Sequence, residues 1–239
     1  MYSTAILATL LPLASALNLF HLPGTSTTGS SSTVKRDSWG GALSLGPTTS
    51  HILSATTTLI PGTAPATQAG ELFLWPGMSN GTGDLIQTTL ESWPDNSWCG
   101  AASGEWCVRA SLFGSFGQLD GTASPVPGDM NVFINYTRNA DGINWTQLVS
   151  DATTGSALSN FTHESGPMTG WGTGTECDSG CTGTIAEQTY KNVVITLASS
   201  DTSFLNTLTT SGGVTYTNAK MSSDGTVLTI DEILVPSMS

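Results

Sequence analysis

Thr189-Tyr190-Lys191-Asn192-Val193-Val194-Ile195-Thr196-Leu197 is a stretch in which apolar and polar side chains alternate along its second half. Successive residues of a β-strand point to opposite faces, so Val193, Ile195 and Leu197 share one face. No segment after the first 16 residues shows a convincing helical period. The alternation therefore predicts a protein built from strands. Two earlier stretches repeat it, with shared faces at Leu53, Ala55, Thr57 and Leu59 and at Val132, Ile134 and Tyr136.

Eleven segments of this kind are separated by residues typical of turns, namely Gly, Pro, Asn, Asp and Ser. There is no internal repeat and no linker, which predicts one domain. Many short strands in one domain favour an all-β antiparallel two-sheet β-sandwich of the concanavalin-like jelly-roll type. The expected strands are Trp39–Leu45, Ile52–Leu59, Glu71–Trp75, Leu85–Glu91, Trp106–Phe113, Asn131–Tyr136, Ile143–Val149, Leu158–Thr162, Thr189–Leu197, Gly213–Thr217 and Val227–Val235.

The composition narrows the choice of partners. The 239 residues include 18 acidic and 6 basic ones, for a net charge of −12, and only 10% are charged. Binding to nucleic acid or to an anionic membrane requires clustered Lys and Arg, so neither partner is expected. The hydrophobic fraction of 38% is enough for a sizeable core and argues against disorder.

The N-terminal region has the pattern of a secretory leader. An apolar stretch, Ala5 to Ala14, ends in the small-residue cleavage pattern Ala14-Ser15-Ala16, which predicts a signal peptide over residues 1–16. A buried core helix is the alternative. Residues 17–36 are predicted to be a pro-segment because they end in the dibasic pair Lys35-Arg36, although a polar linker would also fit. The domain then covers residues 37–239, and the protein is expected to be secreted and extracellular.

Glycosylation and disulfides are expected in such a compartment. Four cysteines allow three pairings, of which the local one, Cys99–Cys107 with Cys177–Cys181, is the simplest. A zinc site competes with this interpretation, but His51 and His163 do not lie at ligand spacing from the cysteines, so neither a metal nor another cofactor is expected. Four Asn-x-Thr sequons begin at Asn80, Asn135, Asn144 and Asn160.

Two segments carry residues suited to chemistry. In Leu85–Trp93, alternation places Gln87, Thr89 and Glu91 on one face, bordered by Trp75 and Trp93. This face could line a groove or be an ordinary solvated face of the sheet.

The second segment is Met168–Cys177, where glycines surround Trp171 and permit close approach of a ligand. Glu176 lies beside the predicted disulfide. The alternative is a Gly-rich hairpin whose Trp packs on the sheet.

Other catalytic patterns are absent or undecided. The chain has no Gly-x-Ser-x-Gly, phosphate loop or His-Glu-x-x-His. A Ser-His-Asp set stays open, although no spacing suggests it. A pair of carboxyls of the glycosidase type could be drawn from Glu91, Asp95, Glu105 and Glu176.

In four places the chain resembles the eqolisins, the secreted fungal glutamic peptidases. Order and spacing agree over about residues 37–93. The matching stretches are Ser38-Trp39-Gly40-Gly41-Ala42-Leu43, Leu53-Ser54-Ala55-Thr56, Trp75-Pro76-Gly77-Met78-Ser79-Asn80 and Ile86-Gln87-Thr88-Thr89-Leu90-Glu91.

The resemblance implies a sandwich with a substrate groove, in which a Gln and a Glu activate water for peptide hydrolysis at acidic pH. Gln87 falls on the position of the catalytic Gln. The position of the catalytic Glu falls on Gly172 or Gly174, and Glu176 is the nearest carboxyl. The predicted catalytic residues are therefore Gln87 and Glu176, and the predicted substrate-binding residues are Trp39, Trp75, Glu91, Trp93 and Trp171.

The sequence is compatible with three functions. The first is an acid-acting glutamic peptidase relative whose partner is a polypeptide. The second is a sandwich that binds or degrades cell-wall polysaccharide, with Trp75, Trp93, Trp98 and Trp171 exposed for stacking on sugar rings. The third is a structural or effector protein, including a catalytically inactive relative of the peptidases. A monomer is expected in each case.

Overall fold

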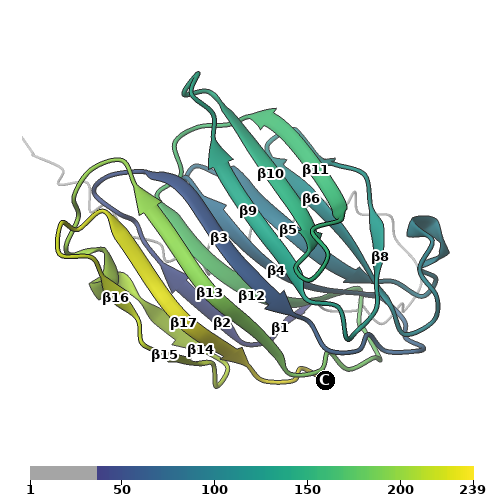
Figure 1. Cartoon of the computed structure of the whole chain (residues 1–239). Coiled ribbons are helices and arrows are strands. Elements are labelled where there is room, and N and C mark those ends of the chain that lie inside the picture. Colours follow the sequence, from purple (N-terminus) through teal and green to yellow (C-terminus); the bar gives the residue numbers. More distant parts are fainter. Residues whose placement is uncertain (1–36) are drawn as a thin grey trace, which may run out of the picture.

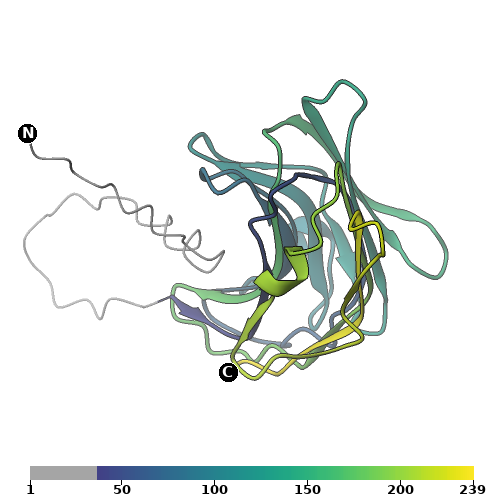
Figure 2. The same cartoon turned by 90° about the vertical axis from the view of Figure 1, so that its left-hand side faces the viewer.

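The computed structural model describes residues 37–239, and these residues form two antiparallel sheets packed face to face (Figures 1 and 2). The predicted signal peptide and pro-segment, residues 1–36, lie outside the described residues. The sandwich confirms the all-β fold expected from the alternation of apolar and polar residues. Within residues 37–239, no helix is long and apolar enough to cross a membrane.

The first sheet has nine strands and carries the candidate site. Its main order is β14-β2-β12-β4-β5-β6-β7, with β1 paired to β12 and β8 paired to β6. The strands are β1 (Ser38–Trp39), β2 (Ala42–Leu45), β4 (Glu71–Ser79), β5 (Leu85–Ser92), β6 (Trp106–Gly114), β7 (Gly117–Asp120), β8 (Ser124–Val126), β12 (Gly170–Asp178) and β14 (Thr209–Ser211).

The second sheet has eight strands in the order β11-β10-β9-β3-β13-β17-β15, with β16 paired to β17. It is the nearer sheet in Figure 1. Its strands are β3 (Ile52–Ile60), β9 (Val132–Arg138), β10 (Asn144–Asp151), β11 (Ala157–Glu164), β13 (Gln188–Leu197), β15 (Thr215–Thr217), β16 (Lys220–Met221) and β17 (Val227–Val235). Two short 3-10 helices, η2 (Ser97–Cys99) and η3 (Phe204–Thr207), lie in connections.

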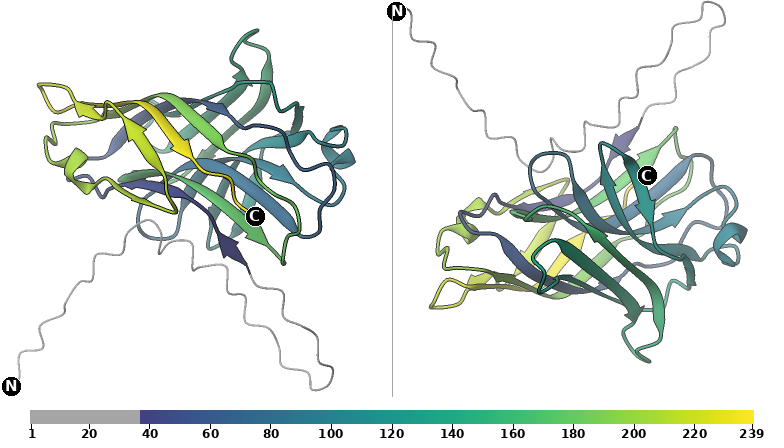
Figure 3. Two further views of the ribbon diagram at one scale, coloured as in Figure 1. Left: turned by 90° about the horizontal axis from the view of Figure 1, so that it is seen from below. Right: turned by 90° about the horizontal axis from the view of Figure 1, so that it is seen from above.

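The core lies between the sheets and is filled by the inward-facing half of each strand. Val193, Ile195 and Leu197 are all buried there, as their alternation predicts. Views from above and below show that strands of the two sheets lie over one another (Figure 3). Large aromatic rings fill the core between these two layers. The largest fully buried side chains include Trp106, Trp145, Trp171, Tyr136 and Tyr190.

The predicted shared face of Leu53, Ala55, Thr57 and Leu59 is wrong at Leu53. Leu53 is 37% exposed, whereas its neighbour Ile52 is fully buried. The pairing of β3 with β13 shifts register between Thr196 and Leu197, so that Ile52 lies opposite Leu197. An extra residue at such an irregularity reverses the face to which the following side chains point, which accounts for the exchange.

The expected strand list also missed β12, which lies inside the first sheet between β2 and β4. Its sequence indicates a segment for close ligand approach or a Gly-rich hairpin, because glycine is uncommon in strands. In the structure, Trp171, Thr173, Thr175 and Cys177 occupy one face of β12, and the alternate positions are mostly glycine. One face of β12 therefore carries a full set of side chains, whereas the other face is largely bare backbone.

Both disulfides have the predicted local pairing. Cys99–Cys107 joins η2 to β6, and Cys177–Cys181 closes the turn after β12, each with 5.8 Å between the Cα atoms. None of the described residues group into a cluster of His, Cys, Asp and Glu that could hold a metal ion.

Candidate binding cleft

A cleft lies on the outer face of the nine-stranded sheet, where β12, β4 and β5 run side by side. The cleft is shallow and small, with a volume of about 40 Å³. Its position follows from alternation: Leu72, Leu74 and Ile86 point into the core, so the residues between them must point outward. The lining residues are Phe73, Trp75, Leu85, Gln87, Thr89, Gln118, Glu176 and Asp178.

Gln87 on β5 is one of the two polar ends of this cleft. Its side chain is only 5% exposed, yet among the described residues its carboxamide has no hydrogen-bond partner from the protein. Its amide atoms are not among the buried polar atoms that lack a partner, so they keep contact with the solvent in the cleft. Gln87 is therefore a group whose donor and acceptor are free to meet a ligand.

The residue across the sheet from Gln87 is a glycine. The strand register aligns Gly172 of β12 with Gly77 of β4, and Gly77 with Gln87. A Cβ atom on Gly77 would lie only 2.9 Å from the Ile86 carbonyl oxygen, which requires a glycine at this position. The floor beside Gln87 is thus bare backbone, and it includes Gly172, one of the two positions, with Gly174, onto which the eqolisin resemblance places the catalytic Glu.

Glu176 is the second polar end, and it lies four residues further along β12 than Gly172. At about 3.4 Å per strand residue, this offset is roughly 13 Å along the sheet. Trp75 lies between the two ends: its ring lies over Gly174, where an added Cβ atom would overlap it. The Gln87 carboxamide and the Glu176 carboxyl therefore line one cleft from strand positions that are offset by four residues.

The Glu176 carboxyl is protonated over most of the pH range. It is 6% exposed, and Oε2 accepts a hydrogen bond from Trp75 Nε1 at 3.4 Å. Burial, followed by the nearby charges of Asp178 and Asp37, raises its pKa to about 8. Glu176 and Asp178 are two residues apart on one face and share a hydrogen bond, in which Glu176 holds the proton. Burial and the charge of Asp37 also raise the pKa of Asp178.

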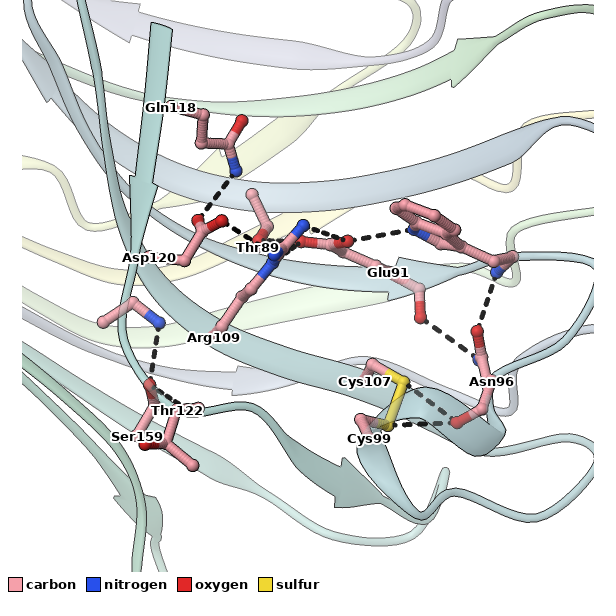
Figure 4. A network of polar contacts seen from close by, with 12 residues as sticks. Thr89, Glu91, Asn96, Cys99, Cys107, Arg109, Gln118, Asp120, Thr122 and Ser159 are labelled. Atoms are coloured by element: carbon pink, nitrogen blue, oxygen red, sulfur yellow. Dashed lines mark hydrogen bonds and ion pairs between the residues drawn. A yellow bond between two sulfur atoms is a disulfide. The ribbon is translucent and has the colours of Figure 1, made fainter.

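Glu91 lies in the same cross-sheet row as Glu176, because both residues pair with Phe73 of β4. Its side chain is fully buried and carries a complete set of donors (Figure 4). Arg109 donates from Nε to Oε1 at 2.7 Å and from Nη2 to Oε2 at 3.0 Å. Thr89 Oγ1 and Trp93 Nε1 donate to the same carboxylate at 2.6 and 3.0 Å. The geometry thus places Glu91 in a structural ion pair rather than at a ligand.

The Glu91 network extends across β6 to β7. Arg109 Nη1 also donates to Asp120 Oδ2 at 2.7 Å, and Gln118 Nε2 donates to Asp120 Oδ1 at 3.0 Å (Figure 4). Beside it, the disulfide Cys99–Cys107 fixes η2 against β6. The network therefore holds Gln118, a lining residue of the cleft, in place.

The tryptophans predicted to bind substrate fall into three environments. Trp75 lines the cleft but is only 3% exposed. Trp39 is 41% exposed and lies opposite Glu176, on the same face of the sheet. Trp93 is partly buried through its bond to Glu91, and its ring lies 5.5 Å from the exposed ring of Trp98.

Trp171 requires a correction. It does not line the cleft and is not available for stacking, because its ring is fully buried in the core between the sheets. It lies five positions before Glu176. An odd offset along a strand places two side chains on opposite faces, so Trp171 and Glu176 point to opposite faces of β12. Trp75 is likewise too buried for the stacking role that the polysaccharide hypothesis gave it.

Several lining residues were not predicted from the sequence. Asp178 could have been found, because it lies two residues after Glu176 and so shares its face. Phe73 could have been found by the same argument from Trp75. Leu85 could also have been found, because it lies two residues before Gln87 on β5. Gln118 belongs to a different strand from the predicted dyad and reaches the cleft only through the folding of the β6–β7 hairpin. No local signal indicates that contact.

No family model and no curated protein sequence matches this chain. Solved structures do match it. Two crystal structures of scytalido-glutamic peptidase, one with a peptide-based transition state analog and one with a transition state analog inhibitor, have TM-scores of 0.50 and 0.51 at 14% and 15% identity. Each match covers 81% of this chain and 97% of the other.

Two further matches have lower TM-scores. The first is SCP-B, a member of the eqolisin family of peptidases in complex with the tripeptide Ala-Ile-His, with a TM-score of 0.46 at 15% identity over 81% of this chain and 96% of that one. The second is the CBM2 module of Lactobacillus casei BL23 phage J-1 evolved Dit, with a TM-score of 0.42 at 17% identity over 61% and 66% of the chains. At these identities, the likeness to the peptidases is one of fold.

Proposed function

We propose that the cleft binds an extended polypeptide segment without the paired Gln and Glu that activate water in the glutamic peptidases. The observation that carries this proposal is the Gln87 carboxamide, which is almost fully buried, opens into the cleft and has no protein partner among the described residues. A carboxamide offers both N–H donors and a C=O acceptor, as a peptide group does. It is therefore complementary to the backbone of an extended chain.

The other end of the cleft adds neutral and aromatic contacts. Below a pH of about 8, Glu176 is protonated, so its carboxyl does not repel the carbonyl oxygens of a polypeptide. Trp39 is exposed beside it, and Phe73 and Trp75 form apolar walls. Such walls bury apolar substrate side chains and contribute roughly 25 cal/mol per Å² of apolar area removed from water.

The missing element is a base opposite Gln87. A general base must lie within hydrogen-bond reach of the water it activates, about 3 Å, or act through one further water. Gly172 supplies no carboxyl there, and the Glu176 position is displaced by roughly 13 Å along the strand. On the other side of Gln87, Asp120 lies in the same row through Ser111, but its carboxylate is already bonded to Arg109 and Gln118. Glu176 is also protonated at acidic pH and so cannot accept a proton from water. The expected activity is thus binding.

A second candidate function is hydrolysis by the Glu176–Asp178 pair itself. Two carboxyls that share one proton can supply a base and an acid in the same site, which is a recurrent arrangement in hydrolases. The shared hydrogen bond between Glu176 and Asp178 favours this candidate specifically. In this case Gln87 would hold the substrate backbone away from the bond that is cleaved.

A titration with an unfolded, carboxymethylated polypeptide separates the candidates. Binding is measured by fluorescence anisotropy at pH 5 for the wild type, Gln87→Ala and a control, Gln118→Ala, which lines the cleft through β7. We expect Gln87→Ala to weaken binding about five- to tenfold, the equivalent of one net hydrogen bond of about 1 kcal/mol. A smaller effect is expected for Gln118→Ala, whose amide is already bonded to Asp120.

Two outcomes would contradict the binding proposal. One is binding that is equally strong in Gln87→Ala. The other is absence of polypeptide binding together with binding to insoluble polysaccharide, which would favour the sugar-binding function instead. Cleavage that persists in Gln87→Ala but disappears in Glu176→Gln and in Asp178→Asn would favour the second candidate.

A further inference from the structure

Three of the four sequons lie on three consecutive strands of the second sheet. They begin at Asn135 on β9, Asn144 on β10 and Asn160 on β11. The middle residue of each is aromatic and points inward: Tyr136 and Trp145 are 1% and 2% exposed, and Phe161 packs against the core. Alternation then forces the Asn and the Thr of each sequon to the outer face.

The strand register gathers these residues into one patch. Leu148 lies directly between Asn135 and Asn160, and Thr146 lies directly between Thr137 and Thr162. The hydroxyls of Thr146 and Thr162 are 3.0 Å apart. We refer to the outward-facing residues Asn135, Thr137, Asn144, Thr146, Asn160 and Thr162 as the sequon patch.

Exposed apolar side chains interrupt the sequon patch. Leu148 is 44% exposed between Asn135 and Asn160, and Phe133, two residues before Asn135 on the same face, is 37% exposed. Exposed apolar side chains in the middle of a sheet face favour association between molecules unless something covers them. The sequons supply a covering group of defined chemistry, since an N-linked glycan is bulky and solubilising.

We propose that Asn135 and Asn160 carry N-linked glycans that cover Leu148 and Phe133 and keep this face of the sandwich free of protein contacts. The co-reactant is a lipid-linked oligosaccharide pyrophosphate of the secretory pathway. Nδ2 of the Asn forms a bond to C1 of the first sugar, the bond from C1 to the pyrophosphate oxygen breaks, and Nδ2 loses one proton as the lipid pyrophosphate leaves. The outer faces of the two sheets lie on opposite sides of the sandwich, so these glycans leave the cleft open.

Site-resolved mass spectrometry tests the first half of this proposal. The full chain is expressed in a eukaryotic secretory host, and the glycosylation of each sequon peptide is measured, with Asn135→Gln and Asn160→Gln as site controls. We expect glycan on both Asn135 and Asn160 in the secreted protein. Secreted, folded protein that carries no glycan at either position would overturn the proposal.

Sedimentation velocity tests the second half. The folded glycoprotein is trimmed by an endoglycosidase that leaves one sugar on each Asn, which avoids any failure of the double variant Asn135→Gln/Asn160→Gln to fold. We expect trimming to shift the protein from monomer to larger species, and Leu148→Ser to prevent the shift. Asn206→Gln, an exposed Asn outside any sequon, is the matched control. A trimmed wild type that stays monomeric would contradict the shielding role.

Discussion

Glu91 and Glu176 lie in one row of one sheet face, two strands apart, but their carboxyls are neutralised in different ways. Both carboxyls are buried. Arg109 donates two hydrogen bonds to Glu91, and Thr89 and Trp93 donate two more. Glu176 interacts with the Trp75 indole and the carboxyl of Asp178, and no cation among the described residues pairs with it.

The difference shows how a chain with few cations divides its carboxyls between structure and chemistry. Only four basic residues follow residue 36, namely Arg109, Arg138, Lys191 and Lys220. The one placed on this face neutralises Glu91, and Glu176 is neutralised by a proton instead. A carboxyl neutralised by a fixed Arg stabilises the fold, whereas one neutralised by a proton responds to pH and to ligands.

Removing the cation at Glu91 is expected to have the largest effect. Arg109→Met leaves the Glu91 carboxyl buried without its partner, which should lower the free energy of unfolding by about 3–5 kcal/mol. Urea denaturation at pH 7 measures this change. Lys191→Met is the control, because its ion pair with Glu232 is exposed and 3.4 Å long, and it should cost less than about 1 kcal/mol. Equal losses in both variants would remove the structural role of the Glu91 pair.

The titration of Glu176 should make the free energy of unfolding depend on pH. Its folded pKa, about 8, is above the ordinary value of 4.5, so the folded state holds a proton that the unfolded state releases between these values. Stability should therefore fall as the pH rises from about 5 to 9, by on the order of 3 kcal/mol for this group. Glu176→Gln should flatten this part of the stability curve. The same slope in the wild type and the variant would show that Glu176 is not the titrating group.

A matched pair of indole substitutions gives a smaller effect. Trp93→Phe removes a 3.0 Å bond to the charged Glu91 and should cost about 1.5–3 kcal/mol. Trp75→Phe removes a 3.4 Å bond to the protonated Glu176, which should contribute less than about 1 kcal/mol. Double-mutant cycles with Glu91→Gln and Glu176→Gln, measured by the same denaturation, separate each bond from the loss of ring packing. A larger coupling for Trp75 with Glu176 than for Trp93 with Glu91 would reverse the assignment of charge to the two carboxyls.

The smallest change in stability is expected for Asp178→Asn, although its effect on titration should be clear. The charge of Asp178 helps to raise the pKa of Glu176, so its removal should move that pKa down toward the ordinary value. Carboxyl carbon NMR titration of Glu176 measures the shift. Asp231→Asn, an exposed substitution, is the control and should leave the titration unchanged.

The sequence predicted the sandwich because alternation survives wherever one face of a strand is apolar, as in Val193, Ile195 and Leu197. It failed at β12, where glycines at Gly170, Gly172 and Gly174 remove one of the two faces that alternation compares. The local disulfides followed from short cysteine spacings, which leave few alternatives to local closure.

The site was only partly accessible from the sequence. Gln87, Trp75 and Glu176 were predicted and all line the cleft. The sequence did not show that Glu91 belongs to an ion pair and Trp171 to the core. The strand period predicts which side chains share a face, but it does not predict what packs against that face. Arg109 lies on another strand, and only cross-strand register shows that it neutralises Glu91 rather than contacts a ligand.

Product analysis of a bound polypeptide tests whether the cleft binds without cleaving, given that Gln87 lies in a row with Gly77 and Gly172 while Glu176 lies roughly 13 Å further along β12. An unfolded, carboxymethylated polypeptide is incubated with the wild type at pH 4, and both the bound fraction and its mass are measured. We expect the polypeptide to be bound and all its peptide bonds to stay intact. Cleavage by the wild type that both Gln87→Ala and Glu176→Gln abolish would contradict the binding proposal.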